Sequence, residues 1–102
     1  ADALTSGDDN IAMGRNALGA STTGCENIAI GTCSLGNCLV TGVDNLGIGR
    51  SALNDVVAGF ENVAVGLGTL SNLTSGDRNV AIGSAALSGG AVSGDHIEFC
   101  ST

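Results

Sequence analysis

The chain has 102 residues and a net charge of −7, and its three basic residues are Arg15, Arg50 and Arg78. So few cations cannot form a basic binding surface, which excludes nucleic acid as a partner. With 17 Gly, no Pro, no Trp or Tyr and two Phe, the chain lacks the large side chains of an ordinary globular core, yet its 43% of hydrophobic residues is too many for a disordered linker. No apolar run reaches membrane-spanning length, so we expect no membrane insertion.

A pentapeptide of the type Asn-Ile-Ala-Ile-Gly recurs along the chain with a spacing of 17 or 18 residues. Each copy has a Gly three residues before its Asn and a Leu four residues after its last Gly. The five copies span residues 10–14, 27–31, 45–49, 62–66 and 79–83, and the Leu residues are Leu18, Leu35, Leu53, Leu70 and Leu87. A fixed period this short predicts stacked coils that bury their apolar surface on one another.

Within each pentapeptide the apolar residues alternate, which is typical of a strand rather than a helix. The sequence therefore predicts an all-β fold, a parallel β-roll or β-solenoid of five coils of 17 to 18 residues, each folded back on itself with the block Leu on a second short strand. We expect the larger apolar residues to form the core with the five Leu: Ile28, Ile30, Val63, Val65, Val80 and Ile82.

The other face of each predicted strand carries very small residues. They are Ala12, Ala29, Gly47, Ala64 and Ala81. Small side chains allow one backbone to approach another closely, so this column is the candidate oligomer interface. The alternative is an ordinary exposed face rich in Ala.

The repeat Gly-x-x-Asn-(Val/Ile)-Ala-(Ile/Val)-Gly-x-x-Ala-Leu resembles the head repeats of trimeric autotransporter adhesins, and still more the 17-residue repeats of phage tail fibres and related bacterial surface proteins. The resemblance covers residues 4–93. It implies a left-handed parallel β-roll, a homotrimer around one axis, and a rigid stalk or receptor-binding head. Three features depart from the pattern: Gly47 in place of Ala, an extra residue in the second and fifth blocks, and the four cysteines.

The Asn column is the strongest polar regularity: Asn10, Asn27, Asn45, Asn62 and Asn79. Stacked side-chain amides can donate to one another and fix the register, so we interpret the column as a structural ladder, with ligand binding as the alternative. Acidic residues follow the same edge: Asp8, Asp9, Glu26, Asp44, Glu61 and Asp77. We expect this acidic file to be a solvated edge that discourages sheet pairing; divalent cations held between coils are the alternative.

Four cysteines have spacings that match no zinc pattern, and they indicate an extracellular or virion context in which disulfides persist. The candidates are Cys25, Cys33, Cys38 and Cys100. Pairing of Cys33 with Cys38 is favoured because a turn separates them, pairing of Cys25 with Cys38 is close behind, and Cys100 is left for a neighbouring chain. Buried reduced thiols are the alternative.

The sequence divides into a repeat domain, residues 1–93, with blocks beginning at residues 7, 24, 42, 59 and 76, and a degenerate sixth block or junction, residues 94–102. In the junction Ile97 stands where the repeat has Asn. His96, beside Asp95 and near Cys100, is a candidate metal ligand, but a lone His in a terminal strand is more often a surface residue. No catalytic arrangement or phosphate loop stands out, so we expect no enzyme, no cofactor and no metal.

The expected function is a non-enzymatic fibre protein, a stiff trimeric stalk or head segment of a phage tail fibre or bacterial adhesin that serves attachment to a host receptor or glycan. Its location would be extracellular or on the virion surface. One alternative is an extracellular filament whose subunits stack head to tail, because the chain starts and ends within a block, with Cys100 at the joint. Another is a monomeric secreted binding solenoid.

Overall fold

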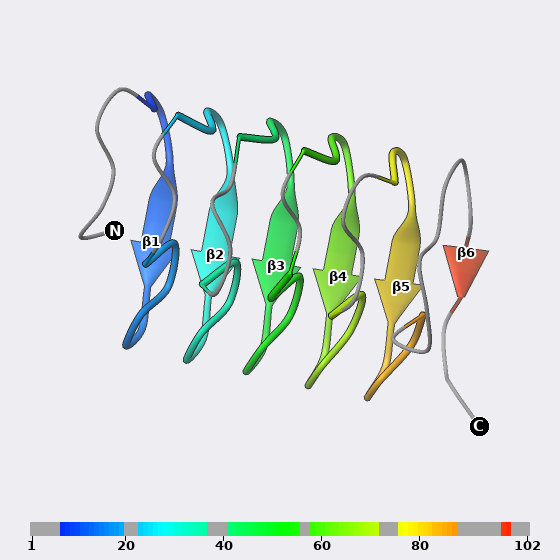
Figure 1. Ribbon diagram of the computed structural model, residues 1–102. Helices are drawn as coiled ribbons and strands as arrows, with labels where there is room; N and C mark the ends of the chain where they lie inside the picture. The colour runs from blue at the N-terminus through cyan, green and yellow to red at the C-terminus, as the bar shows by residue number, and fades with distance from the viewer. Residues whose placement is uncertain are drawn as a thin grey trace.

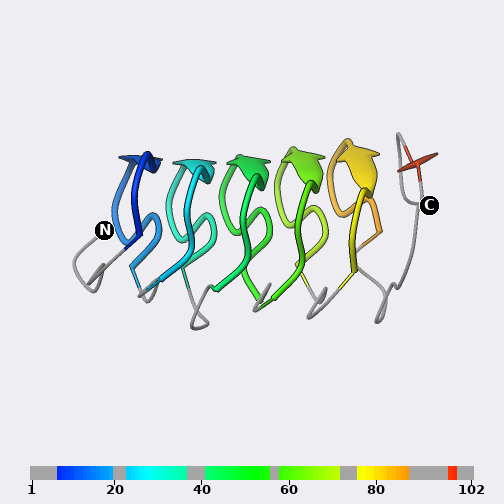
Figure 2. The same ribbon diagram turned by 90° about the horizontal axis from the view of Figure 1, so that it is seen from above.

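The computed structural model describes residues 7–19, 23–36, 41–55, 58–71, 76–87 and 97–98. These residues form a single parallel sheet whose strands follow one another in chain order, β1 to β6. The strands are β1 (Ile11–Met13), β2 (Ile28–Ile30), β3 (Leu46–Ile48), β4 (Val63–Val65), β5 (Val80–Ile82) and β6 (Ile97–Glu98). The protein is thus an all-β solenoid, as the repeat predicts, with one short strand from each coil on the same side (Figures 1 and 2).

The strands pair in the register that the pentapeptides predict, each residue beside its equivalent in the next coil. Ala64, for example, lies between Gly47 and Ala81. The degenerate block continues this sheet, since Ile97 pairs with Val80 and Glu98 pairs with Ala81. The alignment of Ile97 with the Asn column is therefore wrong by one residue, because Ile97 holds the second position of the pentapeptide and follows His96. Parallel pairing between the strands of consecutive coils satisfies the backbone hydrogen bonds of those strands, so the sheet forms without β-hairpins.

The faces of the strands are opposite to those expected. Ala29, Ala64 and Ala81 are completely buried, whereas the larger residues on either side of them are half-buried or exposed. The prediction of an interior built from the larger apolar residues is therefore wrong for every member of that set: Ile28, Ile30, Val63, Val65, Val80 and Ile82. Of the predicted core, Leu18, Leu35, Leu53 and Leu70 are buried and Leu87 packs against it.

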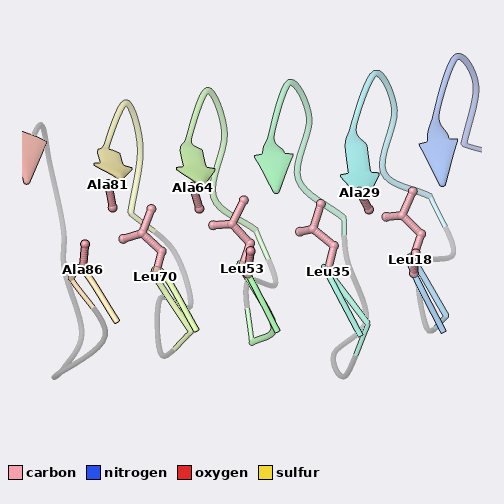
Figure 3. Packing of buried hydrophobic residues seen from close by; sticks show 10 residues of the cluster. Leu18, Ala29, Leu35, Leu53, Ala64, Leu70, Ala81 and Ala86 are labelled. Carbon is pink, nitrogen blue, oxygen red and sulfur yellow. The ribbon is translucent and has the colours of Figure 1, made fainter. Parts of the chain in front are cut away.

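Lack of space explains why the small residues point inward. The block Leu side chains extend from the turns toward the strands and meet the Ala side chains there (Figure 3). A Cβ atom built on Gly47 would already lie 3.5 Å from Cδ1 of Leu53 and 3.3 Å from the carbonyl oxygen of Ala52. A side chain larger than Ala would overlap these atoms, so Ile or Val cannot occupy the interior column.

The block Leu residues do not belong to a second strand. Their φ angles are positive, between 49° and 53° at Leu18, Leu35, Leu53, Leu70 and Leu87, so the left-handed backbone bends where we expected an extended segment. Hydrogen bonds between coils still connect these turns: the Leu35 amide donates to the Ala52 carbonyl at 3.0 Å, and the Leu53 amide donates to the Thr69 carbonyl at 2.9 Å. Bonds within the solenoid offset the strain of an unfavourable φ.

The one interior Gly of the strands is matched by a Ser in the neighbouring turn. Ser34 occupies the position that Ala52 holds in the next coil, and its hydroxyl donates to the Gly47 carbonyl at 2.9 Å. A Cβ at Gly47 would lie 2.8 Å from that hydroxyl oxygen. The two departures from the repeat therefore compensate, because Gly47 makes room for the Ser34 hydroxyl.

The last Gly of each pentapeptide is required by both conformation and space. Gly49 has a φ of 126°, and a Cβ there would lie 2.6 Å from the carbonyl oxygen of Gly66. Gly68 has a φ of 66° and open space around it, and the equivalent Ala85 has a φ of 59°. Only the first of these two glycines therefore excludes a side chain.

We expect Gly49→Ala to destabilise the fold by about 3 kcal/mol, since it combines a forbidden φ with a backbone clash. The matched variant Gly68→Ala should lose only about 1 kcal/mol, the cost of a left-handed Ala. Urea unfolding followed by circular dichroism measures both. Equal losses in the two variants would show that the close approach of the coils at Gly49 is incorrect.

Candidate functional surface

The Asn column forms a hydrogen-bonded ladder inside the solenoid. Asn27, Asn45, Asn62 and Asn79 are at most 1% exposed. The backbone amide of each of these Asn donates to Oδ1 of the Asn before it, and for Asn45, Asn62 and Asn79 the side-chain amide donates to the same oxygen. For Asn62 onto Asn45 the side-chain and backbone distances are 2.9 and 3.2 Å. The same amide also donates to the carbonyl of the Gly that opens the following block, as Asn62 does to Gly76 at 2.7 Å. Asn27, Asn45 and Asn62 therefore each connect their own coil with the coil before it and the coil after it.

Burial of this ladder restricts what it can do. Asn45 and Asn62 use their side-chain donors and their acceptor within the chain, and all four internal Asn are buried, so they present nothing to a ligand from solvent. Asn10, at the first coil, is half-buried, and it donates to the Gly24 carbonyl and accepts from the Asn27 amide. The structure thus gives the column a structural role.

The small-residue column is not available as an oligomer interface. Ala29, Ala64 and Ala81 have no exposed surface, and Gly47 is buried beside them. Only Ala12 in the first strand is exposed. The close approach that these small residues allow is between the strand and the turn of the same coil. The predicted oligomer interface is therefore wrong for Ala29, Gly47, Ala64 and Ala81, and for the exposed Ala12 it stays a prediction.

The opposite side of the sheet presents the larger side chains to the outside. We call this surface the aliphatic face; it consists of Ile11, Met13, Ile28, Ile30, Leu46, Ile48, Val63, Val65, Val80 and Ile82. Met13 is 63% exposed and Ile11 is 52% exposed. The aliphatic-face side chains of β2, β3 and β4 are half-buried, because a neighbouring strand flanks each of these strands on both sides. None of the ten residues is charged. The strands β1 to β5 line up on one side of the solenoid (Figure 2), so these residues form an apolar strip along that side.

The acidic file lies outside the coil at the turn that precedes each strand. Asp8, Asp9, Glu26, Asp44 and Glu61 are exposed, and Asp77 is half-buried. The residue just before each ladder Asn has a positive φ of 56° to 58°, and at four of these five positions it is acidic. Among the described residues no group of three or more His, Cys, Asp or Glu is arranged to hold a metal ion.

Cys25 and Cys33 are half-buried free thiols in this structure, so neither predicted pairing with Cys38 is formed. The Cys25 sulfur accepts from the Asp8 amide at 3.4 Å, and the Cys33 sulfur lies 3.9 Å from the Asn16 side-chain amide. Cys38, Cys100 and His96 lie outside the described residues. Over the part of the chain that is described, no helix has the length and apolar character needed to cross a membrane.

Comparisons with protein-family models, with curated proteins and with solved structures found no match for this chain. Its functional interpretation therefore depends on the surfaces just described.

Proposed function

We propose that this chain is a non-enzymatic segment of a structural fibre in which three copies pack laterally through the aliphatic face. The observation that supports this proposal is that the coil interior is already filled by Ala, Leu and Asn side chains. The filled interior has no space for the ten larger apolar residues of the aliphatic face. An uninterrupted apolar strip of this kind on a soluble protein marks an interaction surface.

Burial of the strip would drive association. Each half-buried Ile or Val that becomes fully buried contributes on the order of 1 kcal/mol. Together, the ten side chains of the aliphatic face on each copy, seven of them half-buried and three exposed, can offset the loss of translational and rotational freedom on assembly. The number of copies follows the resemblance to trimeric fibre repeats: three narrow strips around one axis would bury one another and leave the acidic file on the outside.

The backbone hydrogen bonds between consecutive coils suit a stiff structural element. Consecutive coils are joined before the strand (Glu61 amide to Val43 carbonyl, 3.2 Å), along the strand, and after it (Gly68 amide to Arg50 carbonyl, 2.9 Å). A body connected at each of these levels resists bending and stretching. We place it in an extracellular or virion-surface fibre that serves attachment to a host-surface receptor or glycan.

Light scattering after size-exclusion chromatography tests the lateral contact. We expect the native protein to elute with a mass of three chains, and Ile48→Asp, in the middle of the aliphatic face, to elute as a single folded chain. Thr32→Asp, a charge introduced in the turn outside the face, is the matched control and should retain the mass of three chains. A native protein that stays monomeric at micromolar concentration would overturn the proposal and favour a monomeric binding solenoid.

A further inference from the structure

The last step of the Asn ladder is incomplete. Asn79 is completely buried, and its Oδ1 has no hydrogen-bond partner among the described residues. In the preceding coils the equivalent oxygen accepts from two donors of the next Asn: Asn62 Oδ1 accepts from the Asn79 amide at 3.0 Å and from its Nδ2 at 2.9 Å. A buried acceptor without a donor is unfavourable by an amount similar to a lost hydrogen bond.

A strand is already paired at this edge, but its residues suit the position poorly. β6 contributes two residues, and the residue before Ile97 is His96 where every other coil has Asn. Glu98 pairs with Ala81, at the register position that Ala or Gly holds in every other coil and where Ala29, Ala64 and Ala81 are fully buried. The edge of β5 is therefore occupied by a strand without the ladder amide and without the small interior residue.

The other end of the sheet, at β1, has the Asn and the small residue that β6 lacks. β1 is the first strand of the described sheet, and its paired groups are directed toward the second coil: the Ile11 amide donates to the Asn27 carbonyl, and the Met13 carbonyl accepts from the Gly31 amide. In a parallel ladder the amide of the intervening Ala12 is directed the other way. Asn10 precedes this strand, and within the described residues its backbone amide has no acceptor.

We propose that β1 of a second copy replaces β6 on β5, so that the solenoid continues from one chain into the next. Ile11, Ala12 and Met13 of the second copy would pair with Val80, Ala81 and Ile82, the register found between all the other coils. Asn10 of the second copy then donates to Asn79 Oδ1, and an Ala replaces Glu98 beside Ala81. This end-to-end contact goes beyond the lateral assembly proposed above and does not depend on it.

Sedimentation velocity of the full chain over a concentration series tests this contact. We expect the native particle to lengthen with concentration in whole multiples of its smallest species. Ala12→Pro removes only the outward amide of β1 and should stop the lengthening, while Ala12→Gly, which keeps that amide, should not. A double variant, His96→Asn with Glu98→Ala, gives β6 the missing residues and should weaken end-to-end association roughly tenfold or more.

The outcomes separate this contact from the lateral one. If the native particle keeps one mass at all concentrations, or lengthens equally with Ala12→Pro, the exchange of β6 for β1 is overturned. Ile48→Asp removes the lateral contact. If this variant still lengthens with concentration in steps of one chain, the end-to-end contact is supported. Circular dichroism of each variant shows that it is folded, so that a lost association is not mistaken for unfolding.

Discussion

Ala64→Asp should unfold the chain, whereas Val65→Asp, one residue further along β4, should leave the single chain folded. Ala64 is 0% exposed between the strand and the block Leu residues, so Asp there would place an unpaired charge in a filled interior at a cost of about 4 kcal/mol or more. Val65 is half-buried on the aliphatic face, where a carboxylate can reach water.

Far-ultraviolet circular dichroism and thermal unfolding of the two variants measure this difference. The comparison is matched because the same side chain is introduced at neighbouring positions of one strand. If Val65→Asp unfolds the chain and Ala64→Asp does not, the assignment of the two faces is reversed.

Asn62→Ala should destabilise the fold by about 3 kcal/mol or more, since each buried group left without a partner contributes about 1 to 3 kcal/mol. The variant removes the donor to the Gly76 carbonyl, the acceptor of the Asn79 backbone amide, one of the two donors to Asn45 Oδ1 and one of the two acceptors of Asn79 Nδ2. Asn62→Asp keeps the acceptor but replaces the donor with a charged oxygen, and it should be destabilising to a similar extent.

Asn10→Ala is the control for the ladder, because Asn10 is half-buried at the first coil and makes fewer bonds. We expect its loss in a urea unfolding experiment to be clearly smaller than that of Asn62→Ala. Equal losses at the two positions would contradict the buried, cooperative ladder.

The sequence predicts the period, the strands and their register because each depends on the spacing of the pentapeptides. Strands β2 to β5 cover the second to fourth residues of their copies, and every pair is in register. Alternation also indicates that one strand face is small and the other is large. Alternation does not indicate which face is inside the coil. The large apolar side chains of residues such as Ile30 and Val65 led to the incorrect prediction that their face is buried.

One signal in the sequence could have corrected the faces. Asn62, Ala64 and Gly66 are the first, third and fifth residues of a pentapeptide, so in an extended segment they share one side. A buried ladder at Asn62 therefore requires Ala64 to face inward with it. The left-handed turn at the block Leu, for example at Leu53 with a φ of 53°, could not be predicted from the sequence, because Leu rarely adopts a left-handed backbone conformation.

A single nuclear magnetic resonance measurement tests most directly the claim that the coil is filled by Ala and Leu while the aliphatic face makes the contact between chains. Methyl signals are recorded with a soluble paramagnetic probe, for the native protein and for Ile48→Asp. We expect the methyls of Ala29, Ala64 and Ala81 to be protected in both proteins, and those of Ile30 and Val65 to be protected in the native assembly and strongly broadened in Ile48→Asp. Broadened Ala methyls beside protected Ile and Val methyls in the single chain would contradict the account.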